Sequence, residues 1–150
     1  MSQPLATPLL RATTATFENL ALLAAEEAAG WSDTVDALAA ASVVFDGASR
    51  GRLDVIVSRA LLPVITGNML GVAHASDPAL QEDALGELAN VICGNILGDL
   101  DSVRVEVRTT PPAAYASELV EGEPVTRACI RLDGGMAEAR LYLGKSVRST

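Results

Sequence analysis

The sequence has few of the residues that most often carry chemistry or build a disulfide framework. Aromatic residues make up 3% of its 150 residues, and it holds two cysteines and one histidine. Cys93 and Cys129 cannot form a disulfide scaffold, and neither belongs to a C-x-x-C pair. A zinc site needs more nitrogen and sulfur ligands than these three residues supply. We therefore expect both thiols to act as small buried hydrophobes, and His74 to lie in a surface loop.

Positive charge is also scarce. The chain has 11 Lys and Arg against 19 Asp and Glu, which makes its net charge -8. No Lys or Arg occurs between Arg59 and Arg104. Nucleic acids and anionic membranes are bound through clustered cations. The sequence therefore predicts neither a nucleic-acid partner nor a membrane partner, and it leaves a basic protein partner open.

Long apolar runs and a secretory signal are missing as well. The stretch Ala37–Phe45 is among the longest apolar ones, and it is far shorter than the roughly 18 residues of a membrane helix. Met1 is followed by Ser-Gln-Pro, without the basic and then apolar profile of a signal peptide. We therefore expect a cytoplasmic protein. Hydrophobic residues nevertheless make up 49% of the chain, which excludes a disordered protein and predicts a core of Ala, Leu and Val.

Two short motifs imitate functional sites. Gly144-Lys145-Ser146 looks like the end of a phosphate-binding loop, but the first glycine of that motif falls at Ala139. A Ser-His-Asp triad would have to use His74, but the sequence has no G-x-S-x-G motif to supply the nucleophilic serine. Neither motif is expected to be functional.

The hydrophobic pattern predicts an α+β domain. A first helix is expected over Pro8–Ala29, ending at Gly30, and a shorter one over Ser58–Leu70. Asp77 and Pro78 suit the N-cap and first position of the longest helix, which runs to about residue 100. The expected strands are Val35–Phe45, Arg52–Val57, Val103–Arg108, Val125–Leu132 and Met136–Leu143. Glycine-containing gaps predict hairpins, and hence a mainly antiparallel sheet packed with three helices.

One face of the predicted long helix differs from an ordinary solvated face. At about 100° per residue, Glu87, Asn90 and Gly94 lie within about 40° of Asp83. The leucines and isoleucines at positions 85, 88, 92 and 96 lie on the opposite side and form the core stripe. The outward face therefore carries two acids, an amide and a glycine, and no cation.

Most outward polar residues simply face water, and three features argue against that interpretation here. The face lacks the Lys and Arg that exposed helices usually carry. Gly86, Gly94 and Gly98 lie in or beside it, and each costs roughly 0.5–1 kcal/mol relative to alanine. Asn90 is a weak helix former. A close approach by a partner explains this choice better than solvent does, so we expect Asp83 and Gly94 to contact a partner.

The same helix resembles the signature of the CheC/CheX/FliY phosphatase family. That signature is Asp or Ser, then Glu and Asn on one helix, and then a downstream proline. Here the helix reads Asp83-x-x-x-Glu87-x-x-Asn90 and continues through Val91-Ile92-Cys93-Gly94-Asn95. Pro111-Pro112 follows about twenty residues later.

The resemblance covers most of the chain. Val43–Gly47, Arg52–Val57 and the helix up to Met69-Leu70-Gly71 are similar to the segment that precedes the active helix in CheX-like proteins. The resemblance therefore implies a single CheX-like domain over residues 1–150, with its core at about 8–143.

The resemblance implies a phosphatase that dephosphorylates a phospho-aspartyl, CheY-like response regulator in chemotaxis or two-component signalling. On that analogy, Asn90 places its amide near the phosphoryl group and orients the attacking water, and Glu87 engages the regulator's active-site lysine. The Mg²⁺ belongs to the regulator's site, so no metal or cofactor of its own is expected. CheX-like proteins often dimerise by joining their sheets, so we also expect a homodimer.

The sequence departs from one part of the family pattern. CheC-type members carry a second signature on the first helix, but here the residue three after Glu18 is Ala21 and not Asn. We therefore expect one active site per chain, as in CheX. Two other classes stay open. One is a noncatalytic CheX-like module that binds a regulator or scaffolds a signalling complex, and the other is a small-ligand sensor with a polar-lined pocket.

Overall fold

A computed structural model describes residues 5–30, 38–47, 51–96, 100–108 and 124–144 of the chain. The helices are α1 (Ala6–Asn19), α2 (Leu62–Leu70) and α3 (Pro78–Ile96), and a 3₁₀ turn (Arg59–Leu61) precedes α2. The strands are β1 (Ala25–Glu27), β2 (Leu38–Gly47), β3 (Gly51–Ser58), β4 (Leu100–Arg108), β5 (Thr126–Leu132) and β6 (Gly135–Leu143).

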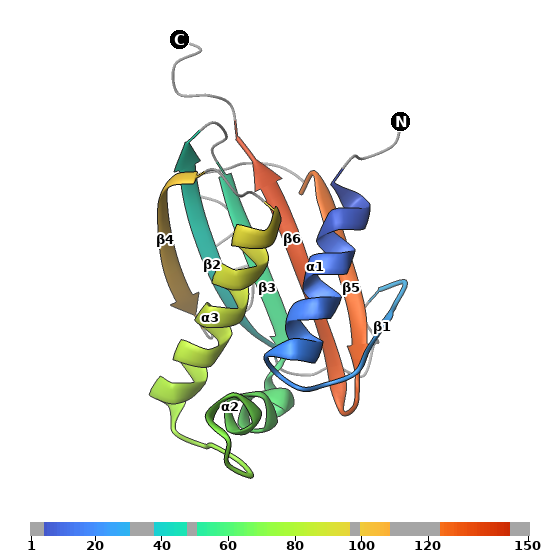
Figure 1. The fold of residues 1–150 in the computed structure, drawn as a ribbon, viewed down its shortest axis with the longest axis vertical. Coiled ribbons are helices and arrows are strands. Elements are labelled where there is room, and N and C mark those ends of the chain that lie inside the picture. Colours follow the sequence, from blue (N-terminus) through green and yellow to red (C-terminus); the bar gives the residue numbers. More distant parts are fainter. Residues whose placement is uncertain (1–4, 31–37, 48–50, 97–99, 109–123, 145–150) are drawn as a thin grey trace.

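The six strands form one sheet in the order β1-β5-β6-β3-β2-β4, and each neighbouring pair is antiparallel. α1 and α3 lie across one face of this sheet, and α2 lies at its lower end in the view of Figure 1. The expected α+β class, with a mainly antiparallel sheet and three helices, is confirmed.

Both predicted hairpins form where the glycines are placed. β2 pairs with β3, and β5 pairs with β6 through a turn that contains Gly134 at a φ of +97°. That φ lies in the left-handed region, which a glycine adopts without a steric penalty. Gly71 ends α2 in the same region, at a φ of +80°. Turn chemistry alone was therefore enough to locate these chain reversals.

The longest helix also begins where the sequence predicts. The Ala79 N–H donates to Oδ1 of Asp77 at 2.9 Å, and Pro78 occupies the first helical position. Its end differs, because α3 ends at Ile96 and Leu100 belongs to β4, where it pairs with Gly47. Leu100, which the apolar pattern assigned to the end of the helix, therefore belongs to a strand because its backbone pairs with β2.

The first helix is shorter than predicted. α1 ends at Asn19 and not at Ala29, and β1 begins six residues later, at Ala25. Between them, Leu22 has a φ of +58°, a conformation that reverses the chain and ends the helix. The backbone of β1 then pairs with β5, which Ala, Leu and Glu propensities do not reveal.

The hydrophobic core lies between the sheet and the two helices above it. Phe17 of α1 and Leu88 of α3 are fully buried against strand residues such as Val55 and Leu141. Ala39 and Ala41 of β2 belong to the same cluster. Alanine supplies small side chains to this core, which contains few aromatics because the chain has few.

The opposite face of the sheet carries buried charge. The Nε of Arg52 lies 2.9 Å from Oδ1 of Asp54, and these two side chains are 6% and 2% exposed. Ser42 Oγ donates to the same carboxylate oxygen at 2.6 Å, and the Arg52 guanidinium lies 4.5 Å from the centroid of the Tyr142 ring. Burial still raises the pKa of Asp54, because its desolvation outweighs the Ser42 hydrogen bond and the Arg52 charge.

Candidate functional site

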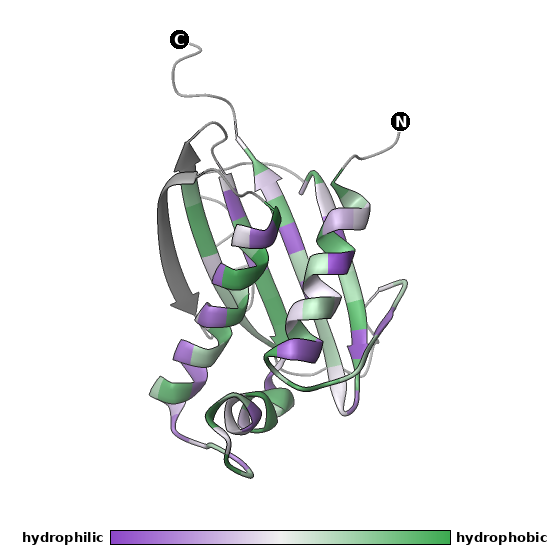
Figure 2. Cartoon of the chain, in the orientation of Figure 1, coloured by the Kyte–Doolittle hydropathy of each residue, from purple (hydrophilic) through white to green (hydrophobic). Residues whose placement is uncertain are grey.

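α3 presents a polar face because its other side is packed into the core. Ala84, Leu85, Leu88, Ala89, Ile92 and Cys93 are buried along this helix. Figure 2 shows apolar and polar residues on opposite sides of α3. A helix held by six buried side chains is a rigid support, so its outward side chains have fixed positions relative to one another.

The four sequence-predicted site residues lie together on this outward face. Asp83, Glu87, Asn90 and Gly94 are all exposed, at successive spacings of four, three and four residues. Side chains at these spacings are neighbours on a helix surface. The predicted helix phase is therefore confirmed, although exposure by itself does not assign a chemical role to any of the four.

Two of the glycines behave differently from each other. A Cβ built on Gly94 would meet nothing within 4 Å, so this position is open to solvent or to a partner. Gly86 is buried, which corrects its placement in or beside the outward face. By the 100° rule it lies on the same flank as Cys93, and that flank also packs inward. Gly98 lies outside the described residues.

The charge of this region has one sign. Asp77, Glu82, Asp83 and Glu87 are exposed, and no Lys or Arg occurs between residues 59 and 104. An anionic phosphoryl group would not be attracted to this surface alone, since like charges repel. Any cation that neutralises such a group has to come with the partner.

The chemistry available on the face is that of positioning. The amide of Asn90 both donates and accepts hydrogen bonds, and Glu87 offers a carboxylate one turn away. Among the residues that the structure describes, no group of three or more His, Cys, Asp or Glu side chains could hold a metal ion. The face can therefore orient a water molecule or hold a cationic group of a partner.

α1 provides no comparable pair. Glu18 is tied into the fold, because its Oε2 accepts a hydrogen bond from the Ala25 N–H at 3.2 Å. Ala21, where a second signature would need an asparagine, is fully buried. Its carbonyl accepts a hydrogen bond from Asn68 Nδ2 at 2.7 Å. Glu18 and Ala21 thus hold the turn after α1 in place. Pro111-Pro112, the remaining element of the signature, lies outside the described residues.

The cysteines and the histidine match their expected roles. Cys93 and Cys129 are buried and free, and burial raises the pKa of Cys93 to about 11. Burial is also the largest cause that raises the pKa of Cys129. Both thiols are therefore protonated at neutral pH and are poor nucleophiles. His74 is exposed in the connection between α2 and α3.

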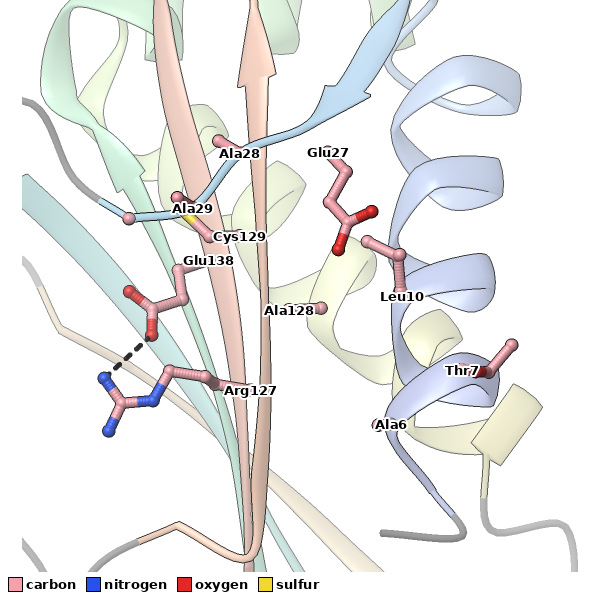
Figure 3. A pocket seen from close by; sticks show the side chains of 11 residues that line it. Ala6, Thr7, Leu10, Glu27, Ala28, Ala29, Arg127, Ala128, Cys129 and Glu138 are labelled. Carbon is pink, nitrogen blue, oxygen red and sulfur yellow. Dashed lines mark ion pairs between the residues drawn. The ribbon is translucent and has the colours of Figure 1, made fainter. Parts of the chain in front are cut away.

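A cavity of about 400 Å³ lies away from α3, between α1, β5 and the end of β1. Figure 3 shows that its polar side chains do not converge: Glu27 points toward α1, whereas Arg127 and Glu138 lie on the other side of the strands. Glu138 is already engaged, because its Oε2 lies 3.8 Å from Arg127 Nη1 and 3.0 Å from Arg140 Nε. This arrangement does not favour the small-ligand sensor over the α3 face.

The described helices include none that is both long enough and apolar enough to cross a membrane. This finding agrees with the short apolar runs of the sequence.

Comparison with known proteins points to one family. The family described as "Chemotaxis phosphatase CheX" matches residues 39–133, which is more than half of the chain. No curated protein sequence matches. Among solved structures, the chain resembles the chemotaxis protein CheX from Vibrio vulnificus, with a TM-score of 0.69 and 15% identity over 93% of this chain and 96% of that one.

Two further solved structures have the same fold. CheX from Desulfovibrio desulfuricans gives a TM-score of 0.66 at 18% identity, covering 93% of this chain and 98% of that chain. The CheX–CheY–BeF3–Mg²⁺ complex from Borrelia burgdorferi gives 0.63 at 12% identity, covering 93% and 97%. At these identities the likeness establishes the CheX-like fold.

Proposed function

The chain belongs to the chemotaxis phosphatase CheX family, and from that membership we propose that it hydrolyses the aspartyl phosphate of a CheY-like response regulator. One observation carries the proposal: Glu87 and Asn90 are exposed one turn apart on a face of α3 that bears no cation. The Borrelia burgdorferi relative, solved together with CheY, BeF3 and Mg²⁺, supports a response regulator as the partner.

Asn90 is assigned the role of orienting the attacking water. The water oxygen forms a bond to phosphorus and the bond between phosphorus and the aspartyl oxygen breaks. Both water protons end on the phosphate, so dihydrogen phosphate leaves and the regulator keeps a free aspartate carboxylate. Phosphoryl transfer of this kind depends mainly on in-line positioning and less on a strong base. A neutral amide holds water by donating and accepting without repelling the phosphate oxygens.

Glu87 is assigned to the regulator's active-site lysine. Its carboxylate is exposed three residues from Asn90, so one partner site can contact both side chains. The acidic face complements a regulator that brings its own lysine and Mg²⁺. Asp83 and Gly94 extend the contact surface on either side of this pair, and the protein needs no metal of its own.

The test is the lifetime of a phosphorylated CheY-like regulator with and without the protein. Catalytic amounts should shorten that lifetime in the presence of Mg²⁺. If the protein binds a regulator loaded with BeF3⁻ and Mg²⁺ but leaves the lifetime unchanged, it is instead the noncatalytic binding module. Absence of both effects with every CheY-like regulator of the organism would reject both functions.

Gly94 tests whether the face docks or only meets water. Because a Cβ at this position has open space, Gly94→Ala should raise the free energy of unfolding by up to about 1 kcal/mol. Gly94→Gln should leave the fold intact and weaken binding of the BeF3⁻-loaded regulator, since a longer side chain obstructs a close partner. Thermal unfolding and binding are the two measurements. If Gly94→Gln binds the regulator as tightly as wild type, Gly94 does not contact the partner and this end of the face is only solvated.

We also expect a homodimer formed by joined sheets. β4 pairs with β2 on one side, and among the described strands none pairs with its other side, so an edge remains to be covered. Light scattering coupled to size-exclusion chromatography should give a molar mass of twice the 15.5 kDa of one chain. A mass of 15.5 kDa at micromolar concentration would contradict this expectation.

A further inference from the structure

Exposed apolar side chains are concentrated beside the N-terminal end of α3. Of the five large hydrophobic residues that are exposed in the described part of the chain, three are Leu70, Val72 and Leu80, at 53%, 53% and 39% exposure. They occupy the end of α2, the following connection and the first turn of α3, a segment in which Figure 2 shows apolar and polar residues next to one another. We call these three residues the α2–α3 apolar patch.

The backbone that presents this patch is held in place. The Val72 N–H donates to the Gly67 carbonyl at 2.9 Å, and the Ala75 N–H donates to the Pro63 carbonyl at 3.2 Å. Gln81 Nε2 donates to the Ala75 carbonyl at 2.9 Å. A Cβ on Gly67 would lie 2.9 Å from the backbone of the connection, so the two segments are in close contact there. A preformed surface loses little conformational entropy when a partner binds.

One member of the patch, Leu80, lies on the same side of α3 as the proposed catalytic residues. Leu80 precedes Asp83 by three residues and Glu87 by seven, and at about 100° per residue it lies within about 60° of Asp83. Leu80 and the site residues therefore form one exposed stripe along α3.

A protein interface of ordinary size, centred on Glu87 and Asn90, is wide enough to include Leu80. A standard interface buries about 800 Å² on each protein, which corresponds to a disc of about 16 Å radius. At about 1.5 Å per residue, Leu80 lies about 13 Å from the midpoint between Glu87 and Asn90. A regulator centred on that pair would therefore cover Leu80.

We propose that the α2–α3 apolar patch is a second docking point for the receiver domain of the response regulator, and that it sets affinity while Glu87 and Asn90 perform the chemistry. This inference rests on the proposed phosphatase function. The surface of the receiver that would contact the patch is an apolar area next to the site that holds Mg²⁺ and the active-site lysine.

A second copy of this chain fits the patch less well than a receiver domain. Asp77, Glu82, Asp83 and Glu87 are all exposed next to it, so two copies meeting here would bring like charges together. Three side chains also offer much less area than the roughly 800 Å² per partner of a stable interface. The patch is therefore better suited to extend a larger contact with a partner that carries positive charge.

The experiment compares the double variant Val72→Ser/Leu80→Gln with wild type. The full-length proteins are titrated with the CheY-like receiver domains of the same organism, loaded with BeF3⁻ and Mg²⁺, and KM and kcat are measured on the phosphorylated forms. The double variant should raise Kd and KM by about threefold to tenfold, since it removes two apolar contacts that lie toward the rim of the interface, where truncation costs less than at the centre. The rate at saturation should stay within about twofold, because the chemistry depends on positioning by other residues.

Val125→Ser is the matched control, because Val125 is also an exposed apolar residue, at 36%, and it precedes β5. It should keep the wild-type Kd and KM. Leu70→Ser is a second patch variant, in case the double variant unfolds. Its Kd should rise in the same direction.

Three results would refute the proposed role of the α2–α3 apolar patch in binding the receiver. If wild type dephosphorylates a regulator but both patch variants keep its Kd and KM, the patch is refuted while the phosphatase function stands. A lower kcat at unchanged KM would also refute an affinity role. Loss of dimer mass with unchanged Kd would assign the patch to a second copy. If wild type neither binds nor dephosphorylates any of these receivers, the proposed phosphatase function is rejected, and the role of the patch is rejected with it.

Discussion

Asn90→Ala should slow dephosphorylation of the regulator by on the order of 10²-fold or more, as expected when a group that positions a reactant is lost. The side chain is exposed on α3 and contributes nothing to the core, so the fold should survive. The loss should appear in kcat, because the oriented water matters in the transition state more than in the bound complex. The measurement is single-turnover decay of the phosphorylated regulator at saturating protein.

Asn95→Ala provides a matched control for that variant. Asn95 is an exposed asparagine of the same helix, but it lies about 120° around the axis from Asp83 and outside the stripe of site residues. It should keep the wild-type rate. Equal rates for wild type and Asn90→Ala would remove Asn90 from the mechanism, and equal losses in both variants would point to a general effect on α3.

Arg52→Met should lower the free energy of unfolding by about 3–5 kcal/mol at neutral pH, because it removes the ion-pair partner of the buried Asp54 carboxylate and leaves only the weaker attraction of Arg140. Both side chains are almost fully buried on the sheet face opposite α1 and α3, and their charged atoms lie 2.9 Å apart. Methionine keeps most of the apolar stem of arginine, so the change removes mainly the charge. Urea unfolding of the two proteins gives the difference.

The loss should depend on pH in a definite direction. Burial already raises the pKa of Asp54 in the folded protein, and removal of Arg52 raises it further. The folded state then binds a proton more tightly than the unfolded chain, so stability is lost as the pH rises through the folded-state pKa. The deficit of Arg52→Met should therefore shrink as the pH is lowered from 8 toward 4.

Asp54→Asn in the Arg52→Met background is the control for that interpretation. With no carboxylate left to protonate at this position, the additional pH dependence should disappear, and part of the stability at pH 8 should return. An Arg52→Met deficit that is the same at pH 8 and pH 4 would show that lost packing, and not the buried charge, causes the destabilisation.

Local chemistry was sufficient for the elements that carry the candidate site. Asp77 and Pro78 start α3 through a cap and a fixed φ, both of which are properties of adjacent residues. The spacing of the apolar residues then fixes the phase of the helix, so the common face of Glu87 and Asn90 follows from its period. The hairpins follow from glycines at the turns. The chemical roles of Glu87 and Asn90 remain predictions.

Long-range contacts decided the rest. Ala25–Glu27 has the composition of a helix but forms β1, because its backbone pairs with β5 about a hundred residues later. Gly86 is buried and Leu80 is exposed although each lies about 60° from Asp83, on opposite flanks of α3, because the rest of the fold packs against only one of these flanks.

The sequence by itself determined the α+β class, the hairpins and the outward face of α3, because each depends on residues within a few turns of one another. Only the tertiary structure decided the strand order, the burial of Arg52 beside Asp54 and the apolar patch next to the site. Those features depend on which surfaces the folded chain brings together. Patterns in one segment carry no information about the distant segments that will cover it.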